Sequence, residues 1–141
     1  MAATAATKGF GTIVEYLSTA PSTYSTIGEL VAVTPPNRTR ETIDATHMAS
    51  PDGYREFISS LRDGGESTLT FNYTKAGYAV LVALFDDDDP ATLRITLPDG
   101  STIVYDGLVT EHPIDDIAID DKVGMSANVK VTGKPVFTAG A

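Results

Sequence analysis

Hydrophobic and polar residues alternate along much of this chain in a pattern that predicts β-strands. The run from Thr68 to Tyr73 has period two, with Leu69, Phe71 and Tyr73 on one side and polar residues on the other. Such a run predicts a strand with one face against the core and the other against water or a neighbour. The same reasoning predicts further strands at Thr12–Tyr16, Thr26–Val33, Leu93–Leu97, Ser101–Val109 and from Met125 to Val131.

One segment has the period of a helix instead. Tyr78, Leu81, Val82 and Phe85 are spaced i, i+3, i+4 and i+7, which predicts a helix over Ala76–Asp87 with one apolar face. Six or more strands with a single helix predict a mainly β domain, an antiparallel β-sandwich or a barrel-like fold. With 141 residues, the chain is long enough for one domain, residues 1–141, with an independent core.

The segment 36–66 lacks clear alternation and is expected to form a long inter-strand loop. It contains two turn signals, Ser50-Pro51-Asp52-Gly53 and Asp63-Gly64-Gly65, and four of the ten basic residues of the chain. The spacing of its apolar residues predicts one short amphipathic helical turn between the two turn signals. Because loops of this length are usually functional, we expect an assembly surface here. Its candidate residues are Arg38, Arg40, Tyr54, Arg55, Phe57, Ile58, Leu61 and Arg62.

The C-terminal part contains two further non-strand segments. Glu111 to Lys122 reads as an acidic loop that Ile114, Ile117 and Ile119 should tether to the domain. Residues 136–141 are expected to form a flexible tail.

Charge is distributed unevenly. The net charge is −9; residues 1–85 carry 8 acids and 6 bases, a balance of −2, and residues 86–141 carry 11 acids and 4 bases, a balance of −7. Such a chain should repel nucleic-acid phosphates. There are no cysteines, and no apolar run approaches the roughly 20 residues of a membrane span.

The residues that carry chemistry do not form a recognisable site. His47 and His112 are far apart and lack the spacing of metal ligands, and the run Asp86–Asp89 lacks the alternation and glycine of a calcium loop. No serine lies in a nucleophile elbow. We therefore expect no catalytic, cofactor or metal site, and a protein that is not an enzyme.

Four motifs in a fixed order carry a family resemblance. They are Thr26-Ile27-Gly28-Glu29-Leu30, Asp44-x-Thr46, Ser50-Pro51-Asp52-Gly53-Tyr54-Arg55-Glu56-Phe57-Ile58 and Leu61-x-Asp63-x-Gly65-Glu66. From about Gly11 to Pro135 the chain resembles the major tail tube proteins of long-tailed phages and of phage-like gene transfer agents. It departs from them at Ser59-Ser60, where the family pattern has a proline and a glycine.

The resemblance implies a structural virion protein, made in the host bacterial cytoplasm and located in the tail. It implies self-assembly into stacked, usually hexameric rings around a continuous inner β-barrel, with the long loop reaching the next ring. The implied partners are other copies of the chain, the tape measure protein, and the tail terminator and tail tip proteins. It implies no membrane partner, and DNA would pass through the lumen during ejection without tight binding. Asp106 and Glu111 are candidates to line that lumen.

Two alternatives remain open from the sequence. One is the tube protein of a phage-tail-like bacteriocin or injection system, which has the same fold. The other is a carbohydrate-binding or adhesin β-sandwich, for which Tyr54 and Phe57 could form an aromatic platform.

Overall fold

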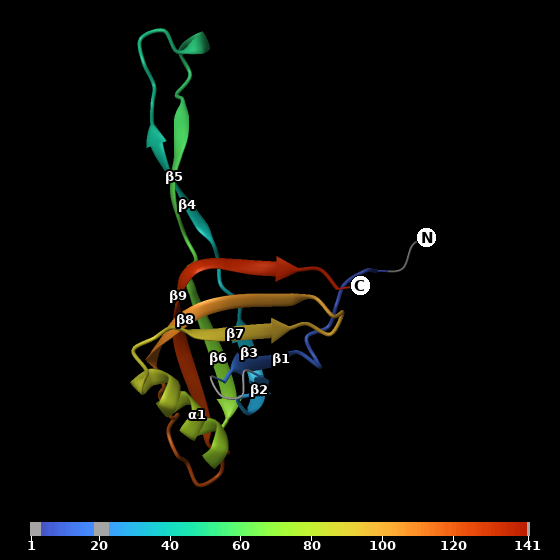
Figure 1. Ribbon diagram of the computed structural model, residues 1–141. Coiled ribbons are helices and arrows are strands. Elements are labelled where there is room, and N and C mark those ends of the chain that lie inside the picture. The colour runs from blue at the N-terminus through green and yellow to red at the C-terminus, as the bar shows by residue number, and fades with distance from the viewer. Residues whose placement is uncertain (1–3, 19–22, 141) are drawn as a thin grey trace.

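The computed structural model describes residues 4–18 and 23–140, which form a β-rich body and a long projecting arm (Figure 1). One sheet and one helix make up the body, and a separate two-stranded hairpin makes up the arm. The strands are β1 (Ile13–Leu17), β2 (Tyr24–Thr26), β3 (Glu29–Thr34), β4 (Thr39–Asp44), β5 (Phe57–Asp63), β6 (Glu66–Asn72), β7 (Ala91–Thr96), β8 (Thr102–Glu111) and β9 (Gly124–Thr138); the helix is α1 (Lys75–Asp86), and a short 3₁₀ turn covers Pro51–Gly53.

The body sheet has seven antiparallel strands in the order β2-β1-β7-β8-β9-β6-β3. Its two edge strands, β2 and β3, are consecutive in the chain and only Ile27 and Gly28 separate them. The sheet must therefore curl until its edges approach each other, which gives a barrel-like shape. The predicted mainly β antiparallel fold with one helix is confirmed in the part of the chain that the structure describes.

The core lies on the concave side of this sheet, and α1 packs over it. The alternation expected near the C-terminus is confirmed, because Met125, Ala127, Val129 and Val131 are all buried. The helix begins one residue before the predicted start, where the side chain of Thr74 accepts a hydrogen bond of 3.1 Å from the Gly77 amide. A buried polar contact joins β6 to β8, since the Tyr105 and Ser67 hydroxyls lie 2.8 Å apart.

Three expectations about the body were wrong. The strand expected at Thr26–Val33 is two strands, because the chain crosses from one sheet edge to the other at buried Ile27. The tail expected at 136–141 is partly ordered, because β9 bends and its last residues, 136–138, pair with β8. Ile117 and Ile119 do not tether the acidic loop, since both side chains are exposed; only Ile114 forms a bridge, to Met125.

Candidate assembly interface

The segment 36–66, expected to be a loop, is a β-hairpin arm that leaves the body between β3 and β6. Strands β4 and β5 pair antiparallel, with Ile43 opposite Ile58 and Asp44 opposite Phe57. The expected helical turn was wrong, because Phe57 to Leu61 lie in a strand. The sequence shows no alternation of apolar and polar residues here because every β4 residue is exposed. Without a buried face, apolar residues need not recur at every second position.

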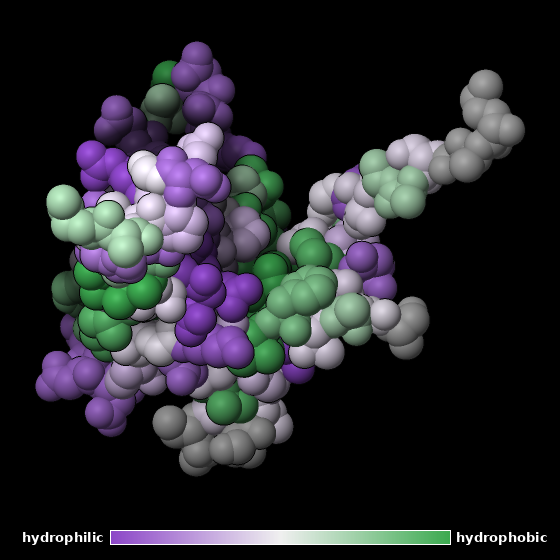
Figure 2. Space-filling view, turned by 90° about the horizontal axis from the view of Figure 1, so that it is seen from above, coloured by the Kyte–Doolittle hydropathy of each residue, from purple (hydrophilic) through white to green (hydrophobic). Residues whose placement is uncertain are grey.

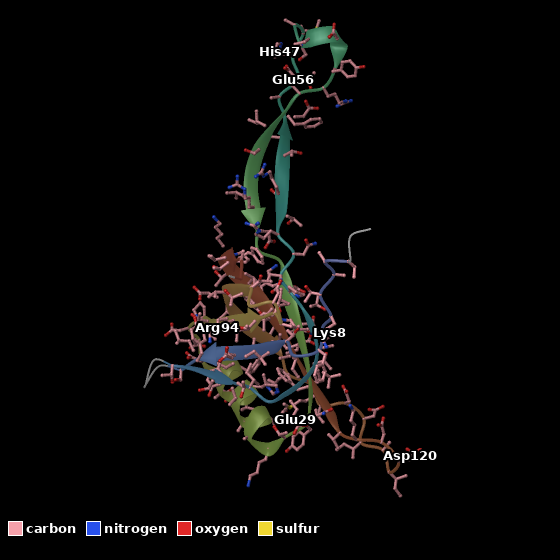
Figure 3. All side chains as sticks on the ribbon, turned by 90° about the vertical axis from the view of Figure 1, so that its right-hand side faces the viewer. Lys8, Glu29, His47, Glu56, Arg94 and Asp120 are labelled. Carbon is pink, nitrogen blue, oxygen red and sulfur yellow. The ribbon has the colours of Figure 1, made fainter. Side chains whose placement is uncertain are left out.

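The tip of the arm is held by hydrogen bonds to Glu56. Its backbone amide donates to the Thr46 hydroxyl at 2.8 Å, and its carboxylate accepts from the Ser50 hydroxyl at 2.8 Å. His47 Nε2 lies 3.4 Å from the same carboxylate (Figure 3). These contacts give the exposed tip a defined shape.

An ion pair crosses the arm below its tip. Arg55 Nη1 donates to Asp44 Oδ2 at 3.0 Å, and the Asp44 carboxylate also accepts from the Thr46 amide at 2.9 Å. The hydrogen bonds from Thr46, and then the one from Arg55, hold the pKa of Asp44 below its usual value. Arg55, predicted as an interface residue, therefore has a partner within its own arm.

Gly64 and Gly65, which were expected to form a turn, lie where the arm joins the body. The chain runs straight through Gly64 and Gly65 from β5 into β6. A Cβ on Gly64 would lie 2.6 Å from Val131 Cγ1, and one on Gly65 would overlap the Asn37 carbonyl. Gly65 also has φ of 79°, so glycine is required by conformation as well as by space. The neighbouring atoms therefore leave no room for a side chain where the arm joins the body.

The surface of the arm carries large apolar side chains together with charged residues of both signs. Tyr54, Phe57, Ile58 and Leu61, all predicted interface residues, are between 55% and 79% exposed. The sequence analysis did not include two other exposed apolar residues of the arm, Ile43 and Met48. In Figure 2, where the arm points towards the viewer on the left, hydrophobic and hydrophilic side chains are interspersed. Monomers seldom leave so many large apolar side chains in water without a partner, so this surface is suited to association.

Three of the predicted arginines lack an acidic partner. In the pairing of β4 with β5, Arg40 lies directly opposite Arg62. Neither of them, nor Arg38, forms an ion pair or side-chain hydrogen bond within residues 4–18 and 23–140. Like charges placed opposite each other on a hairpin are destabilising, so the isolated subunit gains nothing from this arrangement.

These arginines line a groove of about 790 Å³ between the base of the arm and the corner of β9. Lys134 and Pro135 on β9 form the other wall, and Leu61 contributes an apolar side chain that is 79% exposed. The charged lining residues are Arg38, Arg40, Arg62 and Lys134 against Glu41 and Asp63, a balance of +2 in a chain of net charge −9.

A polar face covers the side of the sheet away from α1. Asp106, between buried Tyr105 and core-facing Gly107, points to this side and accepts a 2.7 Å hydrogen bond from Thr92. Glu111 accepts a 3.2 Å bond from the Asn128 amide, whose oxygen in turn accepts from Thr68 at 3.2 Å. The two residues predicted to line a lumen therefore lie on the same exposed, hydroxyl- and amide-rich face.

A smaller hollow of about 440 Å³ lies beside α1, where Tyr78 and Phe85 pack against His112. The Tyr78 hydroxyl lies 3.1 Å from His112 Nδ1, so the histidine is anchored to the helix. Within the described residues, no group of three or more His, Cys, Asp or Glu side chains is arranged to hold a metal ion. In the same part of the chain, α1 is too short to cross a membrane.

Comparison with known proteins decides the family. The sequence profile described as lambda phage tail tube protein matches residues 10–138, nearly the whole chain. The chain belongs to the lambda phage tail tube protein family. This tail tube protein is therefore a structural component of a tail, as the order of its four motifs predicted.

Solved structures share its fold. The tail of an empty gene transfer agent particle, refined with C6 symmetry, superposes with a TM-score of 0.75 at 19% identity, covering 95% of this chain and 100% of that one. The sheath–tube complex of an extracellular contractile injection system gives 0.72 at 11% identity, with coverage of 96% and 93%. The SPP1 tail tube gives 0.69 at 10% identity, with coverage of 95% and 80%. No match was found among curated proteins.

Proposed function

We propose that this tail tube protein assembles through its arm into stacked hexameric rings that form the wall of a tail tube. The observation that carries the proposal is the arm itself. It is a hairpin that projects from the body, with exposed large apolar side chains and with arginines that form no ion pair within the described residues. A second subunit would supply both the apolar contacts and the missing carboxylates.

The tail of the empty gene transfer agent particle, which superposes on this chain with a TM-score of 0.75, has C6 symmetry. In a ring of this kind the curled sheets of neighbouring subunits lie side by side. The polar face that carries Asp106 and Glu111 would then line the lumen, because α1 covers the opposite side of the sheet and would lie outside. The carboxylates of Asp106 and Glu111, repeated around the ring, would repel DNA phosphates, so that DNA slides through without binding.

The partners follow from this arrangement. Each ring contacts copies of the same chain, and the two ends of the tube contact terminator and tip proteins. The tape measure protein would occupy the lumen before DNA passes. We propose no catalytic role, because every feature of the arm and of the polar face serves contact or repulsion.

Electron microscopy of the purified protein tests the proposal. Wild-type protein should form hollow tubes with six-fold rings, and a variant with residues 42–59 replaced by a short Gly-Ser linker should remain a folded monomer. Circular dichroism and thermal melting of the variant establish that the body is folded. Tubes formed equally well without the arm would refute the proposal.

A further inference from the structure

The basic groove at the base of the arm and the acidic loop 112–123 lie at opposite ends of the subunit. In Figure 1 the arm rises from the top of the body, and the loop between β8 and β9 hangs from the bottom. Figure 3 shows the same separation from another side, with His47 at the tip of the arm and Asp120 at the far end of the molecule. Two different surfaces at opposite ends of one subunit suit head-to-tail stacking, which repeats without closing.

The two surfaces also match in charge. The loop 112–123 carries four acids and one base, a balance of −3, and the groove lining has a balance of +2. Arg40 and Arg62, opposite each other and without ion-pair partners in the described chain, provide two guanidinium groups for incoming carboxylates.

Their apolar parts match as well. Ile119 is fully exposed at the end of the loop and Ile117 is 77% exposed, although β-branched aliphatic side chains are ordinarily buried. In the groove the exposed apolar side chain is Leu61, at 79%, while Val131 and Pro135 also line it but are buried. The other acidic run, Asp86–Asp89, lies at the side of the body at the end of α1 and has no comparable pair of exposed isoleucines.

We infer that the loop 112–123 of one subunit docks into the basic groove of a subunit in the next ring, with Asp120 and Asp121 meeting Arg40 and Arg62. This inference rests on the proposed ring stacking and identifies its body-to-body contact. The arm then continues past this contact along the side of the next subunit.

A charge-swap experiment tests the pairing in tubes of the full-length protein, counted by electron microscopy and sedimentation. The variant Arg40→Glu/Arg62→Glu and the variant Asp120→Arg/Asp121→Arg should each lose tubes at least tenfold. The chain that carries all four changes should recover them, as should an equimolar mixture of the two variants, in which rings of the two kinds alternate. Asp88→Arg/Asp89→Arg is the matched control, with the same change in net charge, and should leave tube yield unchanged.

The outcomes separate this inference from the proposed function. Normal tubes from Asp120→Arg/Asp121→Arg, or failure of the four-fold variant when each two-fold variant remains a folded monomer, would overturn the docking. In either case wild-type tubes would leave the ring-stacking proposal standing. Loss of tubes from the groove variant alone would show that the groove holds another surface or partner, which also overturns the inference. Absence of tubes in the wild type would instead refute the proposed function.

Discussion

Arg40 and Arg62 occupy directly opposite positions in the β4–β5 hairpin, and neither has a carboxylate partner within the described residues. Arg55, on the same arm, does have one in Asp44 at 3.0 Å. The sequence could not distinguish these arginines, because the difference depends on the hairpin register. This difference divides the arm into a tip with its own ion pair and a base where Arg40 and Arg62 form no ion pair within the described residues.

Charge reversal at Arg62 and at Arg55 should therefore have different effects. Arg62→Glu places a carboxylate opposite Arg40, so the folded monomer should gain stability by a few tenths of a kcal/mol to about 1 kcal/mol. It should nevertheless stop assembly, because loss of one partner of a desolvated pair costs about 2–5 kcal/mol. Arg55→Glu breaks an exposed pair, which contributes little to stability because water and salt screen it, and should slow assembly less.

Chemical denaturation of the monomers and light scattering during assembly measure both effects. Lys75→Glu, on the first turn of α1, makes the same change in charge away from the arm and serves as the control. Tubes of normal number and length from Arg62→Glu would show that this arginine is merely solvated.

The arm should be less protected than the body in the monomer and should become protected in the tube. It is a two-stranded hairpin whose residues are nearly all exposed, and an isolated hairpin is only marginally stable in water. Hydrogen exchange followed by mass spectrometry should show fast exchange of peptides over residues 54–61 in the monomer and slow exchange after assembly. Peptides over β9 should exchange slowly in both states. Protection of residues 54–61 in the monomer equal to that of β9 would contradict this.

Alkaline pH should destabilise the body through Tyr105. Burial raises the pKa of Tyr105 to about 12 from its ordinary value of 10, despite the hydrogen bond with Ser67. Because the folded-state pKa is the higher one, its contribution to stability is complete below pH 10 and is lost as the pH rises from 10 to 12. The difference of about two units between the unfolded-state and folded-state pKa of Tyr105 corresponds to a loss of about 2–3 kcal/mol in the free energy of unfolding.

Urea denaturation at a series of pH values measures this loss. Tyr105→Phe should lower stability by about 1 kcal/mol at pH 7, through the lost hydrogen bond, and should flatten the decline above pH 10. Tyr54→Phe, on the exposed arm, should retain the full decline. The prediction fails if Tyr105→Phe loses stability above pH 10 as steeply as the wild type.

Charge in the lumen should control how DNA moves. At about 0.15 M salt the Debye length is roughly 8 Å, so the walls and a central duplex still interact. Wild-type protein should show no measurable DNA binding at this salt. In particles, Asp106→Lys/Glu111→Lys should slow DNA delivery, because cationic walls bind phosphates with release of counterions.

Asp88→Lys/Asp89→Lys changes the net charge equally at the end of α1 and should deliver DNA at the normal rate. Micromolar, salt-sensitive DNA binding by the wild-type protein, or equal delivery by both variants, would contradict a repelling lumen at Asp106 and Glu111.

The sequence predicted the body well because burial imposes a period on it. In β9, Met125, Ala127, Val129 and Val131 face the core, so the strand period was visible. In α1 the predicted face was right at Leu81 and Tyr78, but Phe85 is 45% exposed and Val80 and Leu84 pack against the core instead. The arm gave no such period, since every β4 residue is exposed and Phe57, Ile58 and Leu61 are exposed instead of facing a core. Its position as a hairpin was therefore missed, although its residues were selected.

The groove was beyond sequence reasoning for a different reason. Arg38, Arg40 and Arg62 were selected by their clustering along the chain, but Lys134 joins them only because β9 bends beneath the arm. Ile117 and Ile119 were expected to tether the acidic loop to the domain because of their hydrophobicity alone. The fold shows that the hydrophobic core is complete without these two isoleucines. Only then do exposed isoleucines next to acidic residues indicate a docking loop.

The most direct test of the central claim, that the arm joins one ring to the next, is a helical reconstruction of the assembled tube by cryo-electron microscopy. The account predicts six subunits per ring, the polar face of Asp106 and Glu111 towards the lumen, and the arm in contact with a subunit of the adjacent ring. It also predicts that Phe57, Ile58 and Leu61 become buried in that contact. A tube in which the arm points into solvent and these side chains remain exposed would contradict it.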